Sequence, residues 1–392
     1  MPDPVIIGAV RTPVGKYGRA LRDVPAPRLG AIAIEEVVRR TRVDPADVEE
    51  VIMGNVIQAG LGQAPARQAA LFGGLPDKVG AVTVNMVCAS GLKAVTQAAD
   101  SVRTGDQDLI VAGGMENMSA APYLLPRARW GYRHGDAELV DAMVHDGLWD
   151  VYNEFHMGIT GEVVAEKYGI TREEQDAFAY ESHMRALKAI KEGRFEKEIV
   201  PVPLEGPEGE STFSVDEGVR PNTSLEKLAR LPPVFQEGGT VTAGNASQLS
   251  DGGAATVIAS EERAEEMGTD PLGRILGYAT GGVSPKFVME APIPTVNALL
   301  KKLDLTIHDF DLFEHNEAYA SASIVVARQL EIPMDKLNVN GGAVALGHPL
   351  GCSGARILTT LLYAMKDRGA RRGLATLCLG GGNAVAIAVE AT

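Results

Sequence analysis

Cysteine is scarce in this 392-residue chain, and its scarcity limits what the protein can be. The three cysteines, Cys88, Cys352 and Cys378, are too few and odd in number for a disulfide framework. A reducing compartment is therefore expected, and each thiol needs an explanation in burial or in chemistry. No basic presequence precedes the strand predicted at residues 5–10, and no stretch approaches the roughly 18 apolar residues of a membrane span. We expect a cytoplasmic protein.

Positive charge is also in short supply. Lysine and arginine number 37 against 51 aspartate and glutamate residues, which gives a net charge of -14. This balance argues against nucleic acid or an anionic membrane as a partner. An anionic ligand would need a local group of basic residues. The 45% hydrophobic and 22% charged content is ordinary for a globular protein of two or three domains.

One glycine-rich stretch, residues 340–356, surrounds His348. Glycine permits positive φ and close backbone approach, and Pro349 restricts the residue before it to extended geometry. Apolar residues at helical spacing over 355–367 predict a helix shortly after the histidine. Taken alone, the pattern favours a tight turn with His348 as an ordinary turn residue.

A second stretch, residues 84–94, resembles the first and changes that interpretation. Cys88-Ala-Ser-Gly91 parallels Cys352-Ser-Gly354, and each copy is followed by an apolar strand that ends in glycines. The strand predicted at 51–56 likewise has a counterpart at 312–316. The chain is therefore predicted to be internally duplicated. Because ligands collect at the carboxyl ends of strands in α/β sheets, Asn316 and Glu317 become candidate site residues.

Cys88 directly precedes a helix predicted over 91–104. A thiol there feels the positive end of the helix dipole, which predicts a pKa below its usual value of roughly 8.5. The alternative is that Cys88 is only a small buried apolar residue. Its duplicated loop and the glycine-caged His348 favour reactivity. Cys352, in the same register of the second copy, is assigned to packing.

Residues 119–249 interrupt the repeat and form an insertion. A capping box at Thr171 and Glu174 predicts a surface helix that Gly193 ends. One face of this helix is predicted to be apolar: Ala177, Tyr180, Met184, Leu187 and Ile190. The rest is rich in long loops, which are usually functional. Without further information, Arg220, Lys227 and Arg230 are better read as solvated surface charge.

Four motifs in one order resemble the thiolase family, in its short-chain biosynthetic type, the acetyl-CoA acetyltransferases. They are Asn85-Met-Val-Cys-Ala-Ser-Gly91, Asn316-Glu-Ala-Tyr319, Gly347-His-Pro349 and Cys378-Leu-Gly380. The resemblance covers essentially the whole chain. It implies an α/β fold of two duplicated βαβαβαββ halves in five layers, α-β-α-β-α. The first half would be residues 1–118 and 250–270, the inserted loop domain 119–249, and the second half 271–392.

The same resemblance implies Claisen condensation of two acetyl-CoA molecules to acetoacetyl-CoA and CoA, and the reverse thiolysis. Cys88 would carry the acyl group as a thioester, His348 would accept its proton, and Cys378 would move the proton on the α-carbon. Asn316 with a bound water and His348 would form one oxyanion hole. The backbone N–H groups of Cys88 and Gly380 would form the other. No cofactor or metal is implied, because the coenzyme A thioester is itself the substrate.

The resemblance also assigns a coenzyme A site and a homotetramer tied together by loops of the insertion. Arg220, Lys227 and Arg230 would attract the nucleotide phosphates, and His156-Met157 marks a short acyl pocket. Three residues depart from the family pattern: Tyr319 replaces phenylalanine, Cys352 replaces alanine, and Lys227 replaces a small polar residue. The assigned binding residues are Leu148, His156, Met157, Arg220, Lys227, Phe235, Ala243, Ser247 and Tyr319.

Three other readings compete. A degradative 3-ketoacyl-CoA thiolase would accept longer chains. A β-ketoacyl synthase shares the duplicated fold and the cysteine nucleophile, but it would not need Cys378 and would usually lack a long insertion. A non-catalytic thiolase-like protein would be free to lose the nucleophile or the histidine, whereas every catalytic position is filled here. The physiological direction of the reaction is not set by the residues.

Overall fold

The first half of the molecule is a five-stranded sheet with helices on both faces. A computed structural model describes residues 2–206 and 209–392. Met1 of the predicted first half and residues 207–208 of the predicted insertion lie outside the described residues. The sheet order is β1-β12-β5-β3-β4, with β3 parallel to β4 and β5 and with β12 antiparallel to β1 and β5. Its elements are β1 (Pro4–Arg11), α1 (Ala26–Thr41), β3 (Glu50–Gly54), α2 (Pro65–Phe72), β4 (Gly80–Val84), α3 (Ser90–Thr104), β5 (Leu109–Asn117) and β12 (Ser250–Ser260).

The second half repeats this order, so the predicted duplication is confirmed. The strands run β13-β16-β15-β14, with β14 parallel to β15. The counterpart of β4 is reduced to one bridge between Phe313 and Leu337. β1 also pairs with β13, which together with β2 (Gly15–Lys16) makes one ten-stranded sheet. The elements are β13 (Gly273–Gly282), α9 (Pro292–Leu303), β14 (Leu312–His315), α10 (Ala320–Gln329), α12 (Leu350–Arg368), β15 (Arg372–Leu379) and β16 (Asn383–Glu390).

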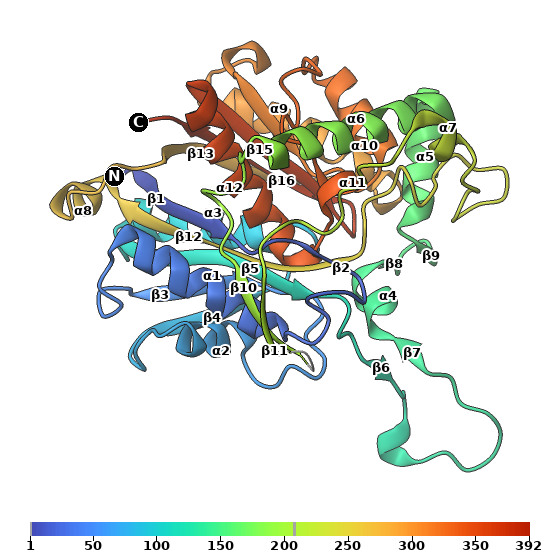
Figure 1. Cartoon of the computed structure of the whole chain (residues 1–392), viewed down its shortest axis with the longest axis horizontal. Coiled ribbons are helices and arrows are strands. Elements are labelled where there is room, and N and C mark those ends of the chain that lie inside the picture. Colours follow the sequence, from blue (N-terminus) through green and yellow to red (C-terminus); the bar gives the residue numbers. More distant parts are fainter. Residues whose placement is uncertain (1, 207–208) are drawn as a thin grey trace.

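The helices form three layers around the two halves of the sheet. α3 and α12 pack against each other and against strands of both halves, so they form the central layer (Figure 1). α1 and α2 cover the outer side of the first half. α9 and α10 cover that of the second. The predicted α-β-α-β-α arrangement is confirmed.

The two central helices meet at their N-termini through glycines. A Cβ on Gly91 would lie 2.9 Å from the carbonyl oxygen of Gly351, and a Cβ on Gly351 would lie 2.8 Å from the Cα of Asn55. Only glycine allows backbones to approach this closely. The residues that precede the two helices, Cys88 and His348, are therefore brought to the same end of the central layer.

Much of the insertion, including an arm that projects from the body, lies on the right of the view, whereas its strands at residues 202–206 and 209–213 lie over the first half (Figure 1). The arm carries β6 (Tyr123–Leu124), η1 (Ala128–Trp130) and β7 (Val140–Asp141). The other elements of the insertion are α4 (Ala142–Gly147), β8 (Trp149–Asp150), β9 (Phe155–His156), α5 (Gly158–Tyr168), α6 (Arg172–Lys191), β10 (Val202–Gly206), β11 (Gly209–Phe213) and α7 (Leu225–Ala229). Short helices elsewhere are α8 (Glu261–Glu266), η2 (Pro285–Glu290), η3 (Ile307–Asp309) and α11 (Ala343–Leu346).

Helix α6 confirms one prediction and corrects another. The capping box of Thr171 and Glu174 is formed, and Gly193 has a positive φ of 67° just after the helix ends. The predicted apolar face is wrong, because Ala177 is exposed while Ser182 and His183 are buried. α6 packs against α7, α10 and α11 through small residues such as Ala179, Ala186 and Ala189. Its buried Ser182 donates to Glu317, and His183 accepts from the N–H of Arg220.

Helix α12 begins at Leu350, five residues earlier than predicted. Cys352 therefore lies inside the helix, where it is 1% exposed and packs against Ala254 and Ala355. Its assignment to packing agrees with this position. Among the helices within residues 2–206 and 209–392, none has the length and apolar character that crossing a membrane requires.

Candidate active site

A strained turn presents Cys88 just before α3. Val87 has a φ of 44°, which is uncommon for a β-branched residue. The Ser90 hydroxyl stabilises the turn: it accepts from the N–H of Met86 at 2.8 Å and donates to the carbonyl of Val87 at 2.6 Å. The Asn85 side chain also accepts from the N–H of Val87 at 3.1 Å. The motif around the cysteine thus holds its backbone in one conformation.

Burial dominates the chemistry of the Cys88 thiol. It raises the pKa of Cys88 to about 12, and the backbone N–H groups of Gly380 and of Cys88 itself lower the pKa only in part. The predicted lowering of this pKa is wrong, because the loss of solvation of the thiolate outweighs the helix dipole. The resting residue is a thiol. The same two N–H groups converge on the sulfur, from β15 and from the turn before α3.

His348 is a neutral base with a defined tautomer. Its Nδ1 lies 2.6 Å from the Oγ of Ser353, whose hydroxyl donates to the carbonyl of Pro349 at 2.8 Å. A hydroxyl that already donates its proton can only accept from Nδ1–H, so Nε2 keeps its lone pair. Burial, with a smaller contribution from the charge of Arg356, lowers the pKa of His348 to about 3. The imidazole is therefore uncharged near neutral pH.

The raised pKa predicts how Cys88 reacts with iodoacetamide in a Cys352→Ala/Cys378→Ala background. The thiolate fraction grows about tenfold per pH unit below the pKa, so the alkylation rate should keep rising beyond pH 9. Stopped reactions analysed by mass spectrometry across the pH range measure this. A plateau below pH 8 would instead indicate a stable thiolate and contradict the dominance of burial.

Asn316 directly follows β14 and faces His348. Its Nδ2 lies 3.4 Å from Nε2 of the histidine. Its Oδ1 is buried, and no group in the described part of the chain donates to it. Buried amide oxygens are usually satisfied, by protein or by ordered water. This acceptor fits the bound water that the resemblance implies for Asn316.

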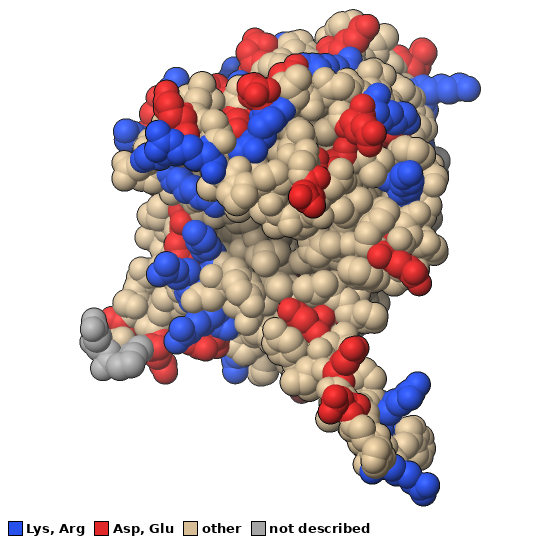
Figure 2. All heavy atoms as spheres, turned by 90° about the vertical axis from the view of Figure 1, so that its right-hand side faces the viewer, with Lys and Arg blue, Asp and Glu red and all other residues tan. Residues whose placement is uncertain are grey.

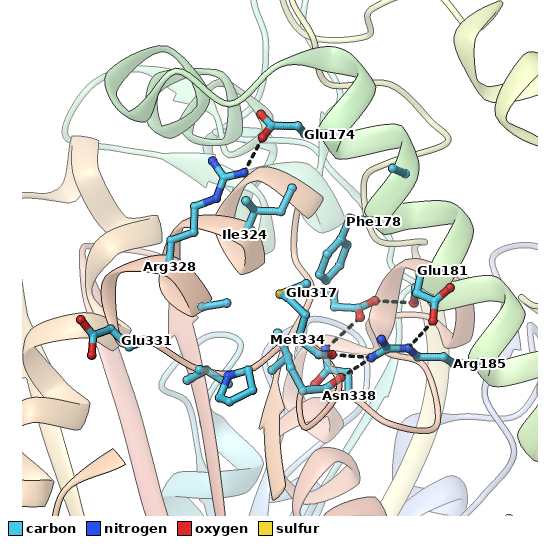
Figure 3. Close-up of a pocket in the computed structure, with 16 residues that line it drawn as sticks. Glu174, Phe178, Glu181, Arg185, Glu317, Ile324, Arg328, Glu331, Met334 and Asn338 are labelled. Carbon is cyan, nitrogen blue, oxygen red and sulfur yellow. Dashed lines mark hydrogen bonds and ion pairs between the residues drawn. The ribbon is translucent and has the colours of Figure 1, made fainter. Parts of the chain in front are cut away.

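Glu317 fixes the loop that carries Asn316. Its buried carboxylate accepts from Ser182 Oγ at 2.7 Å, from Asn338 Nδ2 at 2.8 Å and from the N–H of Val344 at 3.0 Å. Glu317 reaches the lining of a separate cavity of about 580 Å³ between α6 and α10 (Figure 3). The carboxylate thus joins three segments behind the candidate site and does not itself face Cys88.

Cys378 lies in β15 and is 3% exposed. Its Sγ is 3.5 Å from Sδ of Met289, and it shares an apolar cluster with Met157 and Tyr319. Burial and the neighbouring Cys88 raise the pKa of Cys378 well above the usual thiol range. The two cysteines are thus close enough to influence each other, and both are protonated at rest.

Most residues of the predicted binding site converge on these groups. His156 stacks on Phe235 with ring centroids 4.8 Å apart, and Phe235 meets Tyr319 edge-on at 6.1 Å. Leu148 packs in the apolar cluster that includes Cys88. The N–H of Ser247 donates to the carbonyl of Ala318, beside Tyr319, at 2.9 Å. Together these side chains wall a compact apolar space around the sulfurs.

The predicted basic residues lie apart from that space. Both terminal nitrogens of Arg220 are 3.3 Å from the carbonyl of Ala243, and Lys227 and Arg230 are exposed in and just after α7. None of the three lines the cavity beside the turn that carries Cys88. The face that carries the insertion is hollowed, with lysines and arginines gathered along one side (Figure 2).

A cavity of about 640 Å³ lies beside the turn that carries Cys88. Its lining includes Val87, Met157 and Gly380, and also Trp149 and Tyr152 of the β8–β9 hairpin. Neither aromatic residue was predicted. Ser353 and Met289 were also missed. The position of Ser353 in the first turn of the helix after His348 could have indicated it, whereas nothing near Met289 in the sequence does.

These features define a class: a duplicated α/β protein with a thiol, a neutral imidazole and paired backbone N–H groups at one end of its central helix layer. The chain belongs to the thiolase family. The family descriptions "Thiolase, N-terminal domain" and "Thiolase, C-terminal domain" match residues 4–262 and 269–391.

Similar proteins cover the chain from end to end. An acetyl-CoA acetyltransferase of Cupriavidus necator is 53% identical over 391 residues, with 100% of both chains covered. One of Syntrophomonas wolfei is 52% identical and covers 99% of this chain and 98% of its own. The crystal structure of the Bacillus anthracis acetyl-CoA acetyltransferase matches with a TM-score of 0.98 at 44% identity, covering 100% of this chain and 99% of that one.

Proposed function

We propose that this chain is an acetyl-CoA acetyltransferase that works through an acetyl-Cys88 thioester. The observation that carries the proposal is that Cys88 and His348 directly precede the two central helices, whose N-termini meet through Gly91 and Gly351, and that the N–H groups of Gly380 and Cys88 are directed at the Cys88 sulfur. The substrates are acetyl-CoA in one direction, and acetoacetyl-CoA with CoA in the other. The named relatives support this activity.

In the first half-reaction, Cys88 Sγ attacks the thioester carbon of acetyl-CoA. Because the resting thiol is protonated, its proton must pass to a base as the S–C bond forms, and Nε2 of His348 is the free acceptor. The carbonyl oxygen gains negative charge, which the N–H groups of Cys88 and Gly380 stabilise. The C–S bond to coenzyme A then breaks, and the leaving thiolate takes the proton from the imidazolium.

In the second half-reaction, the Cys378 thiol passes its proton to Nε2 of His348, and the resulting thiolate removes a proton from the methyl carbon of a second acetyl-CoA. The enolate oxygen is stabilised by the Nε2–H of the imidazolium and by a water held on Oδ1 of Asn316. The enolate carbon attacks the acetyl group on Cys88, the C–C bond forms, and Cys88 leaves as a thiolate. The thiolate takes the proton from the imidazolium, which restores both resting groups as acetoacetyl-CoA is released.

The closed apolar space predicts a preference for short acyl chains. Met157, Phe235 and Tyr319 wall the site beside Cys378, so each extra methylene must displace a packed side chain at roughly 1–3 kcal/mol. We expect kcat/KM for thiolysis to fall about ten- to two-hundredfold with each methylene added between acetoacetyl-CoA and 3-ketohexanoyl-CoA. A substrate panel with free CoA measures this. Similar values on an eight-carbon substrate would favour the degradative, broader-specificity thiolase.

The binding of coenzyme A in the insertion rests on its loops and its basic residues. The path from the surface hairpin to the sulfurs of Cys88 and Cys378 is lined by Leu148, His156 and Met157. Such a path would accommodate the pantetheine arm of coenzyme A. Arg220, Lys227 and Arg230 lie farther out, where the nucleotide phosphates of an extended ligand would reach. Ala243 and Ser247 belong to the loop that lies between these two groups.

Two exposed surfaces support a homotetramer. β4 is an edge strand with Val82 43% exposed, and an edge strand offers unpaired backbone groups to a second copy. The arm of residues 123–141 carries Trp130 at 86% exposure together with Tyr123 and Leu139. We expect sedimentation of the full chain to give a tetramer and Trp130→Ser/Leu139→Ser to give dimers. A monomer at micromolar concentration would refute the proposal.

The proposed domains follow from the sheet. β12 pairs with β1 and β5, so residues 250–270 complete the half begun by residues 1–118. Residues 119–249 form the inserted loop domain and 271–392 the second half. The cytoplasmic location stays a prediction.

A further inference from the structure

A group of buried charges lies behind the active site and has no direct partners. Arg356 of α12 and Glu314 of β14 are each 1% exposed. Within residues 2–206 and 209–392, all three guanidinium nitrogens of Arg356 and both carboxylate oxygens of Glu314 lack a hydrogen-bond partner. The free Oε2 of Glu198 is in the same condition. Six buried polar atoms of strong hydrogen-bonding groups are thus unsatisfied by the protein.

These six atoms need hydrogen-bond partners from outside the protein chain, because a buried charge without a partner is strongly unfavourable. Arg356 and Glu314 form no ion pair within 4 Å in the described residues, yet each is the opposite charge that most strongly affects the pKa of the other. By contrast, nearby Arg11 is fully paired with Glu198 and Asp216 at 2.6 and 2.7 Å. Glu314 and Arg356 are thus the two charged side chains of this group that leave every polar side-chain atom without a hydrogen-bond partner in the described residues.

We propose that ordered water molecules bridge Glu314 to Arg356, and that this bridged pair fixes the distance between β14 and α12. Water suits the site because a buried water needs two to four polar partners, and here donors and acceptors are both present. Water can accept from the guanidinium nitrogens and donate to the carboxylate oxygens at the same time, whereas the carboxylate of Glu314 would repel an anion.

The position of Glu314 and Arg356 gives the pair a role in the reaction, and this inference rests on the proposed function. Asn316 follows Glu314 by two residues, and His348 precedes Arg356 by about two helical turns. Asn316, just after β14, contacts His348, just before α12, at the proposed substrate site. Glu314 and Arg356 are therefore positioning residues: a shift of β14 against α12 would separate the two groups that hold the enolate oxygen.

Other charged side chains also affect Glu314 and Arg356. The charges of Glu317, in the following loop, and Glu198, in the insertion, raise the pKa of Glu314, and the charge of Arg368 in α12 lowers it. The charge of Arg11 lowers the pKa of Arg356, and that of Asp216 raises it. Burial raises the pKa of Glu314 to about 8, with Arg356 opposing the rise. Arg356 also contributes to the low pKa of His348, whereas Glu314 has no resolved effect on it.

A high-resolution crystal structure of the full chain tests the bridge without reference to activity. We expect at least one water hydrogen-bonded to both the Glu314 carboxylate and the Arg356 guanidinium. A direct ion pair between the two side chains, or the lack of any bridging water, would overturn the proposal. A second crystal soaked in bromide separates the occupants, since an anomalous peak at this position would show a halide site instead.

Substitutions then test the positioning role. Arg356→Met should lower kcat/KM for acetoacetyl-CoA thiolysis by up to about 100-fold, because small displacements of oriented groups are costly. It should also raise the pH of the acidic limb of Cys88 acetylation, since the charge that lowers the pKa of His348 is gone. Glu314→Gln should lower kcat/KM without moving that limb. Cys352→Ala, buried on the same helix, is the control and should keep most activity.

The double variant decides whether the pair acts as a unit. Glu314→Leu/Arg356→Leu should unfold at a higher temperature than either single variant, because no charge is left alone in the core. Losses of thermal stability that simply add would overturn the coupling. Should wild-type protein prove inactive on acetyl-CoA, the proposed function would fail while the crystallographic and stability results still decide the bridge.

Discussion

Cys88→Ser should abolish both condensation and thiolysis, with kcat lower by about 10⁴-fold or more. The resting thiol depends on His348 to take its proton during attack. A serine hydroxyl is far less acidic than a thiol and would sit in the same desolvated turn, so the same base cannot activate it to a useful extent. Steady-state assays in both directions measure the loss.

The matched control for this variant is Cys352→Ala. Cys352 occupies the same register of the duplicated sequence, but it lies inside α12 among small apolar side chains. It should keep most activity and lose only packing energy, of order 1 kcal/mol. If Cys352→Ala were as inactive as Cys88→Ser, the division of roles between the two cysteines would be wrong.

Cys378→Ala should separate the two half-reactions. Formation of acetyl-Cys88 needs the thiol, the imidazole and the two N–H groups, none of which is supplied by the Cys378 side chain. Condensation needs a base at the α-carbon, and loss of such a group costs about 10²–10⁴-fold. The variant should therefore accumulate acetyl-enzyme, while exchange of α-hydrogens with solvent is suppressed. Normal condensation by this variant would remove Cys378 from the mechanism.

Much of the fold could be predicted because its signals are local. The capping box at Thr171, the strand-to-glycine pattern and the repeat around Cys88 all depend on short stretches, and the structure confirms each. The comparisons confirm the family that four short motifs indicated. Duplication helped, since each half provided a check on the other.

What could not be predicted depends on distant partners. The buried face of α6 is set by distant segments, because Ser182 donates to Glu317 and His183 accepts from the N–H of Arg220, and periodicity cannot show such partners. The pKa of Cys88 follows from desolvation by the whole fold, which outweighs the local helix dipole. Met289 reaches Cys378 from a segment 89 residues away in the chain. Glu314 and Arg356 belong to different elements, β14 and α12, and nothing in the sequence relates them.

The most direct test of the account is the intact mass of Cys378→Ala after brief exposure to acetyl-CoA, followed by peptide mapping. The account predicts a mass gain of one acetyl group, located on Cys88, and no gain in a Cys88→Ser/Cys378→Ala protein. It also predicts no gain in His348→Ala/Cys378→Ala on the same time scale, because the thiol then has no base. An unmodified Cys378→Ala protein, or an acetyl group on any other residue, would contradict the central claim that Cys88 carries the acyl group.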